Sequence, residues 1–282
     1  MPRSESSSVQ QARQMLADRL RELAKDAGLE GKGLAALCGW HPSKVSRIAT
    51  GKTRPSEDDI RIWCTACGAE DQVPDLVASL RDVEGIWRTW RRLERAGLRR
   101  SQTERLPLYE RTRRFRSYGS WAFPGLLQTY RYTEDVLRMI QKQRVALDDV
   151  ADAVAARMER QRVMHEGRRT FAFLIEESVL RNSLSSPEAH DEQLAHVVTV
   201  IGLANVSIGV IPARRRRTQL PVENFWIYDS TQVNVELVSG YLTLTQPSEV
   251  EAYADTFSRM AEMAVYGAEA KELINRVRQA IL

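Results

Sequence analysis

Residues 31–56, GKGLAALCGWHPSKVSRIATGKTRPS, constrain the fold of this chain more than any other stretch. Apolar residues recur there at helical spacing in two short runs, one on each side of Gly39. Gly39 can adopt the positive φ that ends a helix, and Pro42 suits a first helical position, where its missing N–H costs nothing. Two short helices joined by such a turn form a helix-turn-helix. We expect its core to contain Leu34, Ala35, Leu37, Gly39, Val45 and Ile48.

The second of these helices, residues 42–50, has an apolar face and a polar face. Successive helical residues turn by about 100°, so Val45 and Ile48 point one way and the polar residues another. Arginine can bond two guanine acceptors at once, serine and threonine can bond either base type, and lysine neutralises phosphate. The predicted base contacts are Ser43, Lys44, Ser46 and Arg47. The predicted phosphate contacts are Lys32, Thr50, Lys52 and Arg54.

A solvated basic face on an ordinary helical domain is the alternative interpretation. Residues 31–56 hold five basic residues and no acid, and a basic run alone would favour that alternative. The order of the parts favours DNA binding instead: a small residue, a glycine turn, a proline start, then SKVSRI and GKTRPS.

Residues 16–72 resemble the Xre-like, or Cro/C1-type, helix-turn-helix family. The stretch GWHPSKVSRIATGK (39–52) is similar to the recognition helix of that family and the loop after it. The resemblance implies an all-α DNA-binding domain in which the second helix of the helix-turn-helix enters the major groove of DNA.

The charge of the chain is distributed unevenly along its length. Its 282 residues suffice for two domains at roughly 100–200 residues each. Residues 1–105 carry 19 Lys and Arg against 15 Asp and Glu, whereas residues 106–282 carry 22 against 22. The whole excess of +4 therefore lies in the part with the helix-turn-helix, as a contact with nucleic acid requires.

We expect a disordered N-terminus over 1–10 and a helix-turn-helix domain over 11–74. A linker helix and linker follow over 75–105, with 97–105 as the linker itself. The helix, over 75–96, is predicted from an apolar seam that could pack within the domain or across a dimer. The seam consists of Leu76, Leu80, Val83, Trp87 and Trp90.

The sequence indicates a cytoplasmic protein without membrane contact. No secretory signal is visible, and the longest apolar stretch, 197–211, is shorter than the roughly 20 residues that a membrane helix needs. The three cysteines, Cys38, Cys64 and Cys67, are interpreted as buried free thiols, because a zinc or redox site would need further ligands or a βαβ context. No metal and no cofactor is expected.

The second half of the chain, 106–282, alternates helical and strand-like segments. Helices are expected over 133–143, 148–166, 187–203, 248–266 and 268–280. Strands are expected over 170–175, 206–211, 224–228, 233–238 and 241–245. Most of the strands fall together after helices, so an α+β fold is favoured over a doubly wound sheet.

Residues 106–282 also resemble the uncharacterised C-terminal domain of WhiJ-type regulators. The matching stretches are FPGLLQT (123–129), FLIEESVLRNSL (173–184), QLAHVV (193–198) and VSIGVIP (206–212). The resemblance implies a regulator that often acts with a small partner protein encoded nearby, in an arrangement likened to toxin and antitoxin.

The sequence contains little that indicates enzyme chemistry. It lacks a glycine-rich phosphate loop, an HExxH motif and a G-x-S-x-G motif, so no enzyme activity is expected. Trp121 and Phe123 could line a ligand pocket, although aromatic residues at the start of a domain are more often core. Arg214, Arg215, Arg216 and Arg217 are predicted to form an exposed loop between two strands, either for an anionic partner or simply solvated, because no acid lies near them in sequence.

These observations favour a transcriptional regulator that binds double-stranded DNA as a homodimer. Its C-terminal domain would serve dimerisation and the sensing of an effector or a partner. Two other classes of function stay open. One is an antitoxin-like interaction protein that holds a small partner protein and regulates its own gene. The other is a sensor with a small-molecule pocket in the C-terminal domain.

Overall fold

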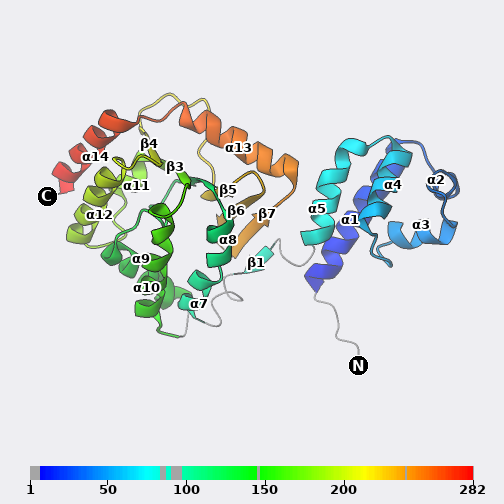
Figure 1. Ribbon diagram of the computed structural model, residues 1–282, viewed down its shortest axis with the longest axis horizontal. Coiled ribbons are helices and arrows are strands. Elements are labelled where there is room, and N and C mark those ends of the chain that lie inside the picture. The colour runs from blue at the N-terminus through cyan, green and yellow to red at the C-terminus, as the bar shows by residue number, and fades with distance from the viewer. Residues whose placement is uncertain (1–6, 83–86, 90–96, 145–146, 239, 282) are drawn as a thin grey trace. The chain divides into compact units, whose positions relative to one another are not determined.

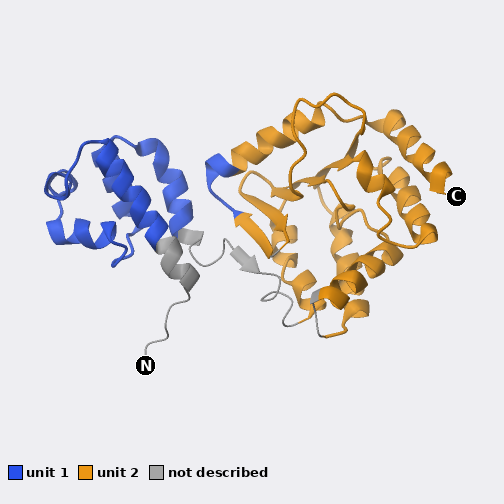
Figure 2. Cartoon of the chain, turned by 180° about the vertical axis from the view of Figure 1, so that it is seen from behind, with its two compact units in different colours: residues 1–86, 244–249 blue, residues 87–243, 250–282 orange. Residues whose placement is uncertain are grey.

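The computed structural model describes residues 7–82, 87–89, 97–144, 147–238 and 240–281. The chain divides into two compact units (Figure 2). The first comprises Met1–Ile86 with Leu244–Glu249, and the second comprises Trp87–Thr243 with Val250–Leu282. The predicted disordered N-terminus lies outside the described residues as far as residue 6, and Ser7 already begins the first helix.

The first unit is helical (Figure 1). Its helices are α1 (Ser7–Asp26), α2 (Gly31–Cys38), α3 (Pro42–Ala49), α4 (Glu57–Cys67), a short 3-10 helix (Glu70–Gln72) and α5 (Val73–Asp82). Helices α2 and α3 and the turn between them form the predicted helix-turn-helix. The capping residues explain where the helices end. Gly39 and Gly68 follow α2 and α4 in the left-handed conformation, with φ of 67° and 65°. Ser56 and Asp59 form a reciprocal capping box at the start of α4.

A single apolar core holds these helices together. Its central residues are Leu16, Leu20, Leu34, Val45, Ile48, Ile60 and Trp63. Trp63 is the largest of them and is 1% exposed, and its indole N–H donates to the carbonyl of Leu20 on α1 at 2.9 Å. Leu37 is 62% exposed, so its predicted place in the core is wrong, and Gly39, which caps α2, is exposed as well. Leu37 lies one turn after Leu34 on a short helix that has a single buried stripe.

The long helix predicted over 75–96 does not form. Helix α5 ends at Asp82, and Trp87–Thr89 form strand β1, which pairs antiparallel with residues 240–242. Leu76 and Leu80 of the predicted seam are buried in the core of the first unit, which removes them from any dimer contact. Val83 and Trp90 lie outside the described residues.

The second unit is built on one mixed sheet with helices around it. Its strands are β1 (Trp87–Thr89), β2 (Arg114–Gly119), β3 (Thr170–Glu176), β4 (Val206–Ile211), β5 (Phe225–Tyr228), β6 (Gln232–Leu237) and β7 (Gly240–Leu244). Its helices are α7 (Leu98–Thr103), α8 (Leu106–Arg111), α9 (Tyr130–Arg144), α10 (Val150–Gln161), α11 (Glu177–Arg181), α12 (Pro187–Val200), α13 (Pro247–Ala261), which begins in the first unit, and α14 (Gly267–Ile281), together with a 3-10 helix (Arg162–Met164).

The strands of the sheet lie in the order β1-β7-β6-β5-β2-β3-β4. Strands β2, β3 and β4 are parallel to one another, and helices connect them, as parallel neighbours require. Strands β5 and β6 run antiparallel beside them. The predicted fold class, an all-α helix-turn-helix domain followed by an α+β domain, is confirmed.

Two further segments differ from the expectation. Strand β2, which the sequence did not indicate, pairs with β3 on one side and β5 on the other. The predicted linker, 97–105, contains helix α7, which packs on α10. Leu98 of α7 is 1% exposed and shares a small core with Leu137 and Val150. The residues after 97 therefore belong to the second unit.

Gly209 on β4 has no room for a side chain. A Cβ atom there would lie 2.7 Å from the ring of Tyr266 and 2.8 Å from Leu174. The adjacent residue, Val210, exchanges backbone hydrogen bonds with Val265, of 3.0 and 2.8 Å. This bridge brings the segment before α14 over the end strand of the sheet, and the glycine permits the ring to lie there.

Within the described residues, no group of three or more His, Cys, Asp and Glu residues is placed to hold a metal ion. In the same part of the chain, no helix combines the length and apolar character needed to cross a membrane.

Cys64 is expected to resist alkylation in the folded protein. It is fully buried, and burial together with the nearby Cys67 raises the pKa of its thiol to about 11. Since the thiolate is the reactive form and an ordinary cysteine titrates near ~8.5, labelling of Cys64 by iodoacetamide at about pH 8 should be at least about 100-fold slower than in the unfolded chain. Mass spectrometry of the labelled peptides measures both rates. Equal rates in the native and unfolded protein would contradict this expectation.

Candidate nucleic-acid interface

Helix α3 is positioned by its own sequence. Pro42 occupies its first turn, and the side chain of His41 caps it by accepting a hydrogen bond from the Ser43 amide at 3.3 Å. Val45 and Ile48 are 3% and 1% exposed and attach the inner face to the core. The opposite face is therefore held outward on a rigid support.

Ser46 and Arg47 stand exposed on that outer face. The guanidinium of Arg47 makes no hydrogen bond or ion pair with any described residue, so all of its donors are available to a partner. The Ser43 hydroxyl lies 2.8 Å from Nδ1 of His41, which engages it in the cap. Of the predicted base contacts, Ser46 and Arg47 are thus the two whose side chains are exposed and uncommitted in the described structure.

Lys44 is placed differently from the other predicted base contacts. Its ammonium donates to Asp59 on α4 at 2.6 Å and lies 4.1 Å from the centre of the Trp40 ring. Burial alone would raise the pKa of Asp59, but hydrogen bonds from Lys44 and Ser56 lower it, so the carboxylate stays ionised. This pair ties α3 to α4 and directs the lysine along the edge of the helix.

The predicted phosphate contacts also divide into two groups. Lys32 on α2 and Lys52 after α3 are exposed, and neither makes a hydrogen bond or ion pair with a described residue. Arg54, in contrast, donates to the carbonyl of Leu80 on α5 at 2.7 Å, and the Thr50 hydroxyl donates to the Ser46 carbonyl at 2.8 Å. These two side chains secure the segment after α3 to the domain.

The four consecutive arginines lie in the segment between β4 and β5. Arg214, Arg215 and Arg216 are exposed. Arg217 is not part of an exposed cluster, because it forms a two-pronged ion pair with Glu176 on β3, with one bond of 2.8 Å. The Tyr118 hydroxyl donates to the same carboxylate at 2.8 Å. The expectation failed for Arg217 because its acid comes from a distant strand.

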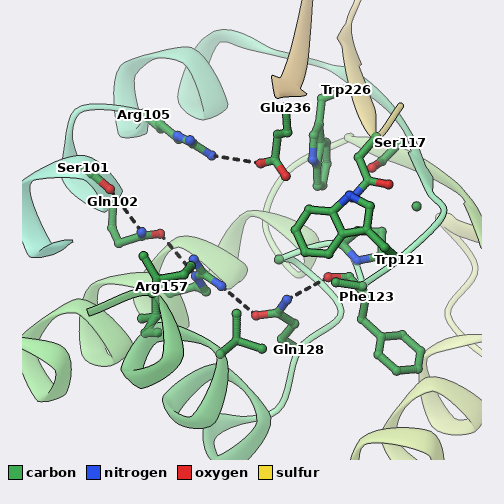
Figure 3. A pocket seen from close by; sticks show the side chains of 18 of the residues that line it. Ser101, Gln102, Arg105, Ser117, Trp121, Phe123, Gln128, Arg157, Trp226 and Glu236 are labelled. Atoms are coloured by element: carbon green, nitrogen blue, oxygen red, sulfur yellow. Dashed lines mark hydrogen bonds and ion pairs between the residues drawn. The ribbon is translucent and has the colours of Figure 1, made fainter. Parts of the chain in front are cut away.

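The C-terminal unit contains a cavity (Figure 3). Trp121 and Phe123 both line it. Arg105, Arg157 and Arg160 line it as well and were not predicted from the sequence. A signal was present, because Arg157 and Arg160 follow Val150 and Ala153 at helical spacing and so share one face of α10 with them.

Helices α2 and α3 with the turn at Gly39 between them define the first unit as a helix-turn-helix domain, and the exposed Arg47, Lys32 and Lys52 on it are consistent with DNA binding. Residues 15–80 match the family described as "Helix-turn-helix domain". Residues 108–276 match the family described as "Domain of unknown function (DUF5753)". This second match covers more than half of the 282 residues, so the chain belongs to the DUF5753 family. No curated protein and no solved structure matches the chain.

Proposed function

We propose that this protein is a sequence-specific transcriptional regulator of the Xre-like, Cro/C1 type, related to the WhiJ-type regulators. The observation that carries the proposal is the exposed and uncommitted guanidinium of Arg47 on the outer face of α3. In this proposal α3 enters the major groove, where Arg47 and Ser46 reach base edges. Lys32 and Lys52 hold phosphates and fix the orientation of the helix.

In this proposal the protein acts in the cytoplasm, binds an inverted repeat of DNA as a homodimer and has no enzyme activity. One recognition helix reads few base pairs, so affinity requires two half-sites roughly one helical turn apart. The C-terminal domain is the candidate for dimerisation and for sensing an effector or a partner protein.

Selection of full-length protein on randomised double-stranded DNA tests the proposal. The enriched sequences should contain an inverted repeat whose half-sites are centred about 10 base pairs apart, or a multiple of that spacing. Light scattering should give a dimer on the selected site. Enrichment of no sequence, or of a half-site without dyad symmetry bound by a monomer, would refute the corresponding part of the proposal.

An antitoxin-like role is the second candidate. Arg214, Arg215 and Arg216 support it, since three exposed arginines suit an acidic partner surface. Pull-down of a small partner protein with and without operator DNA distinguishes this role from that of a regulator without such a partner.

A further inference from the structure

The cavity of the C-terminal unit lies entirely among residues 98–238 and has a volume of about 290 Å³. A water molecule takes about 30 Å³ in the liquid, so the cavity has room for a small organic molecule rather than for one or two waters. Residues of α7 and α10, the segment 117–128 and the strand β6 contribute to its wall (Figure 3).

Positive charge dominates the polar part of this wall. Three arginines, Arg105, Arg157 and Arg160, line the cavity, and Glu236 is the one carboxylate among the described residues that line it. Glu236 lies 4.0 Å from Arg105. Two guanidinium groups therefore remain without a carboxylate in the described structure, and buried charges of this kind are normally paired.

The partners of those two arginines are neutral. Arg157 donates to the side-chain oxygens of Gln102 at 3.2 Å and Gln128 at 2.7 Å. Arg160 is 2% exposed, and its contact with the Gln102 carbonyl is long, at 3.5 Å. Its Nε is buried and has no hydrogen-bond partner. An unpaired buried donor costs stability, and a ligand oxygen would recover that cost.

Burial and crowding both act against the charge of Arg157. Burial, together with the neighbouring guanidinium groups of Arg160 and Arg105, lowers the pKa of Arg157 to about 9. The group remains protonated at neutral pH, so the protein maintains a concentrated positive charge at a cost. An anion in the cavity would attract Arg157 and so offset the repulsion from the neighbouring guanidinium groups.

The rest of the wall is apolar and aromatic. Trp226 and Phe123 are 7% and 2% exposed, and Leu137 of α9 is 1% exposed. Trp121, which is 49% exposed, also lines the cavity. Cavities that combine apolar walls with a few convergent polar groups are typical of small-molecule sites.

We propose that this cavity binds a small organic anion, with a carboxylate or phosphate group held by Arg157 and Arg160 and an aromatic or aliphatic body against Trp226 and Phe123. Guanidinium groups bind carboxylates and phosphates in the same way, through paired N–H donors. The inference names the class of effector for the sensing role proposed above. Binding itself does not depend on DNA, so it is tested without DNA.

The test uses full-length protein at fixed ionic strength and three probes with the same bicyclic body: 2-naphthoate, 2-naphthyl phosphate and the neutral 2-naphthamide. Calorimetry and the fluorescence of the cavity tryptophans measure affinity. At least one of the two anions should bind about tenfold or more tightly than the amide, because charged hydrogen bonds are about twice as strong as neutral ones. Equal affinity of all three probes, or binding of none, overturns the proposal.

Two variants locate the anion in the cavity. Arg157→Gln should abolish the preference for the anion, while the melting temperature of the ligand-free protein stays the same or rises, because a buried charge has been removed. Glu236→Gln should tighten anion binding, since it removes the carboxylate that opposes the anion. Arg168→Gln is the matched control, an exposed arginine outside the cavity, and should change neither quantity.

A lower melting temperature of Arg157→Gln with an unchanged preference for the anion would assign the arginines a structural role and overturn the proposal. Weaker anion binding by Glu236→Gln would overturn it as well. Loss of anion binding and failure of the DNA selection are separate results, because each is measured in the absence of the other ligand.

Discussion

Trp63→Ala is expected to unfold the helix-turn-helix domain in a large fraction of the molecules. The substitution removes the largest side chain of that core and its hydrogen bond to the Leu20 carbonyl. Loss of a buried Trp or Phe ring costs about 3–5 kcal/mol, and domains have a total stability of about 5–15 kcal/mol. Operator binding should fall in proportion to the folded fraction.

Hydrogen exchange followed by mass spectrometry measures this effect segment by segment. Amides of α1, α3 and α4 should lose protection in Trp63→Ala, whereas amides of β2, β3 and β4 should keep theirs. The control is Trp63→Phe, which keeps an aromatic ring and loses the N–H donor, with a cost nearer 1 kcal/mol for the bond. If the amides of these helices are as well protected from exchange in Trp63→Ala as in Trp63→Phe, the core of this domain does not depend on Trp63.

Arg47→Ala is expected to relax sequence discrimination at one position of each half-site while the domain stays folded. The side chain is exposed and makes no hydrogen bond or ion pair with a described residue, so its loss leaves the core intact. A bidentate contact between arginine and guanine contributes about 1–3 kcal/mol, and its loss should relax one position of each half-site. The measurement is a specificity profile from randomised DNA, determined for the variant and the parent at the same salt concentration.

Two variants provide the comparison. Lys52→Ala should weaken binding to all sequences alike and reduce the slope of log affinity against log salt by about 1, as loss of one phosphate contact does. Arg61→Ala removes an equal charge from an exposed position on α4, outside the recognition helix, and should leave the profile unchanged. Identical profiles for Arg47→Ala and the parent would reject Arg47 as a base contact.

The parts of the fold that local signals determine were predictable from the sequence. Gly39 and Gly68 stop helices by their own backbone freedom, and Ser56 with Asp59 starts one within a single turn. The apolar spacing of Val45 and Ile48 then places Arg47 outward. Each of these features depends on residues close in sequence, so a single sequence is enough to read them.

The parts that failed depend on distant partners. Strand β2 contains Arg114 and Arg116, two charged residues that do not indicate a strand. Their partner is distant in sequence: the Asp229 carboxylate accepts a hydrogen bond from the Arg114 amide, and the Asp229 backbone carbonyl accepts one from the Arg116 guanidinium. The helix predicted through Trp87 fails because Trp87 lies on a short strand that pairs with β7. Arg217 finds its carboxylate on β3, and the arginines of the cavity meet only after α7 and α10 pack.

The close packing around Gly209 has a consequence for how this family can vary. Because a Cβ atom at that position would meet the ring of Tyr266 at 2.7 Å, the two positions cannot change independently. A relative that carries alanine at position 209 should carry a smaller residue at position 266 and a shifted or smaller side chain at position 174, which would lie 2.8 Å from the new Cβ atom. The change at position 266 should come before the change at position 209. A smaller residue at position 266 leaves the backbone of β4 in place, whereas a methyl group added first at position 209 would overlap the ring.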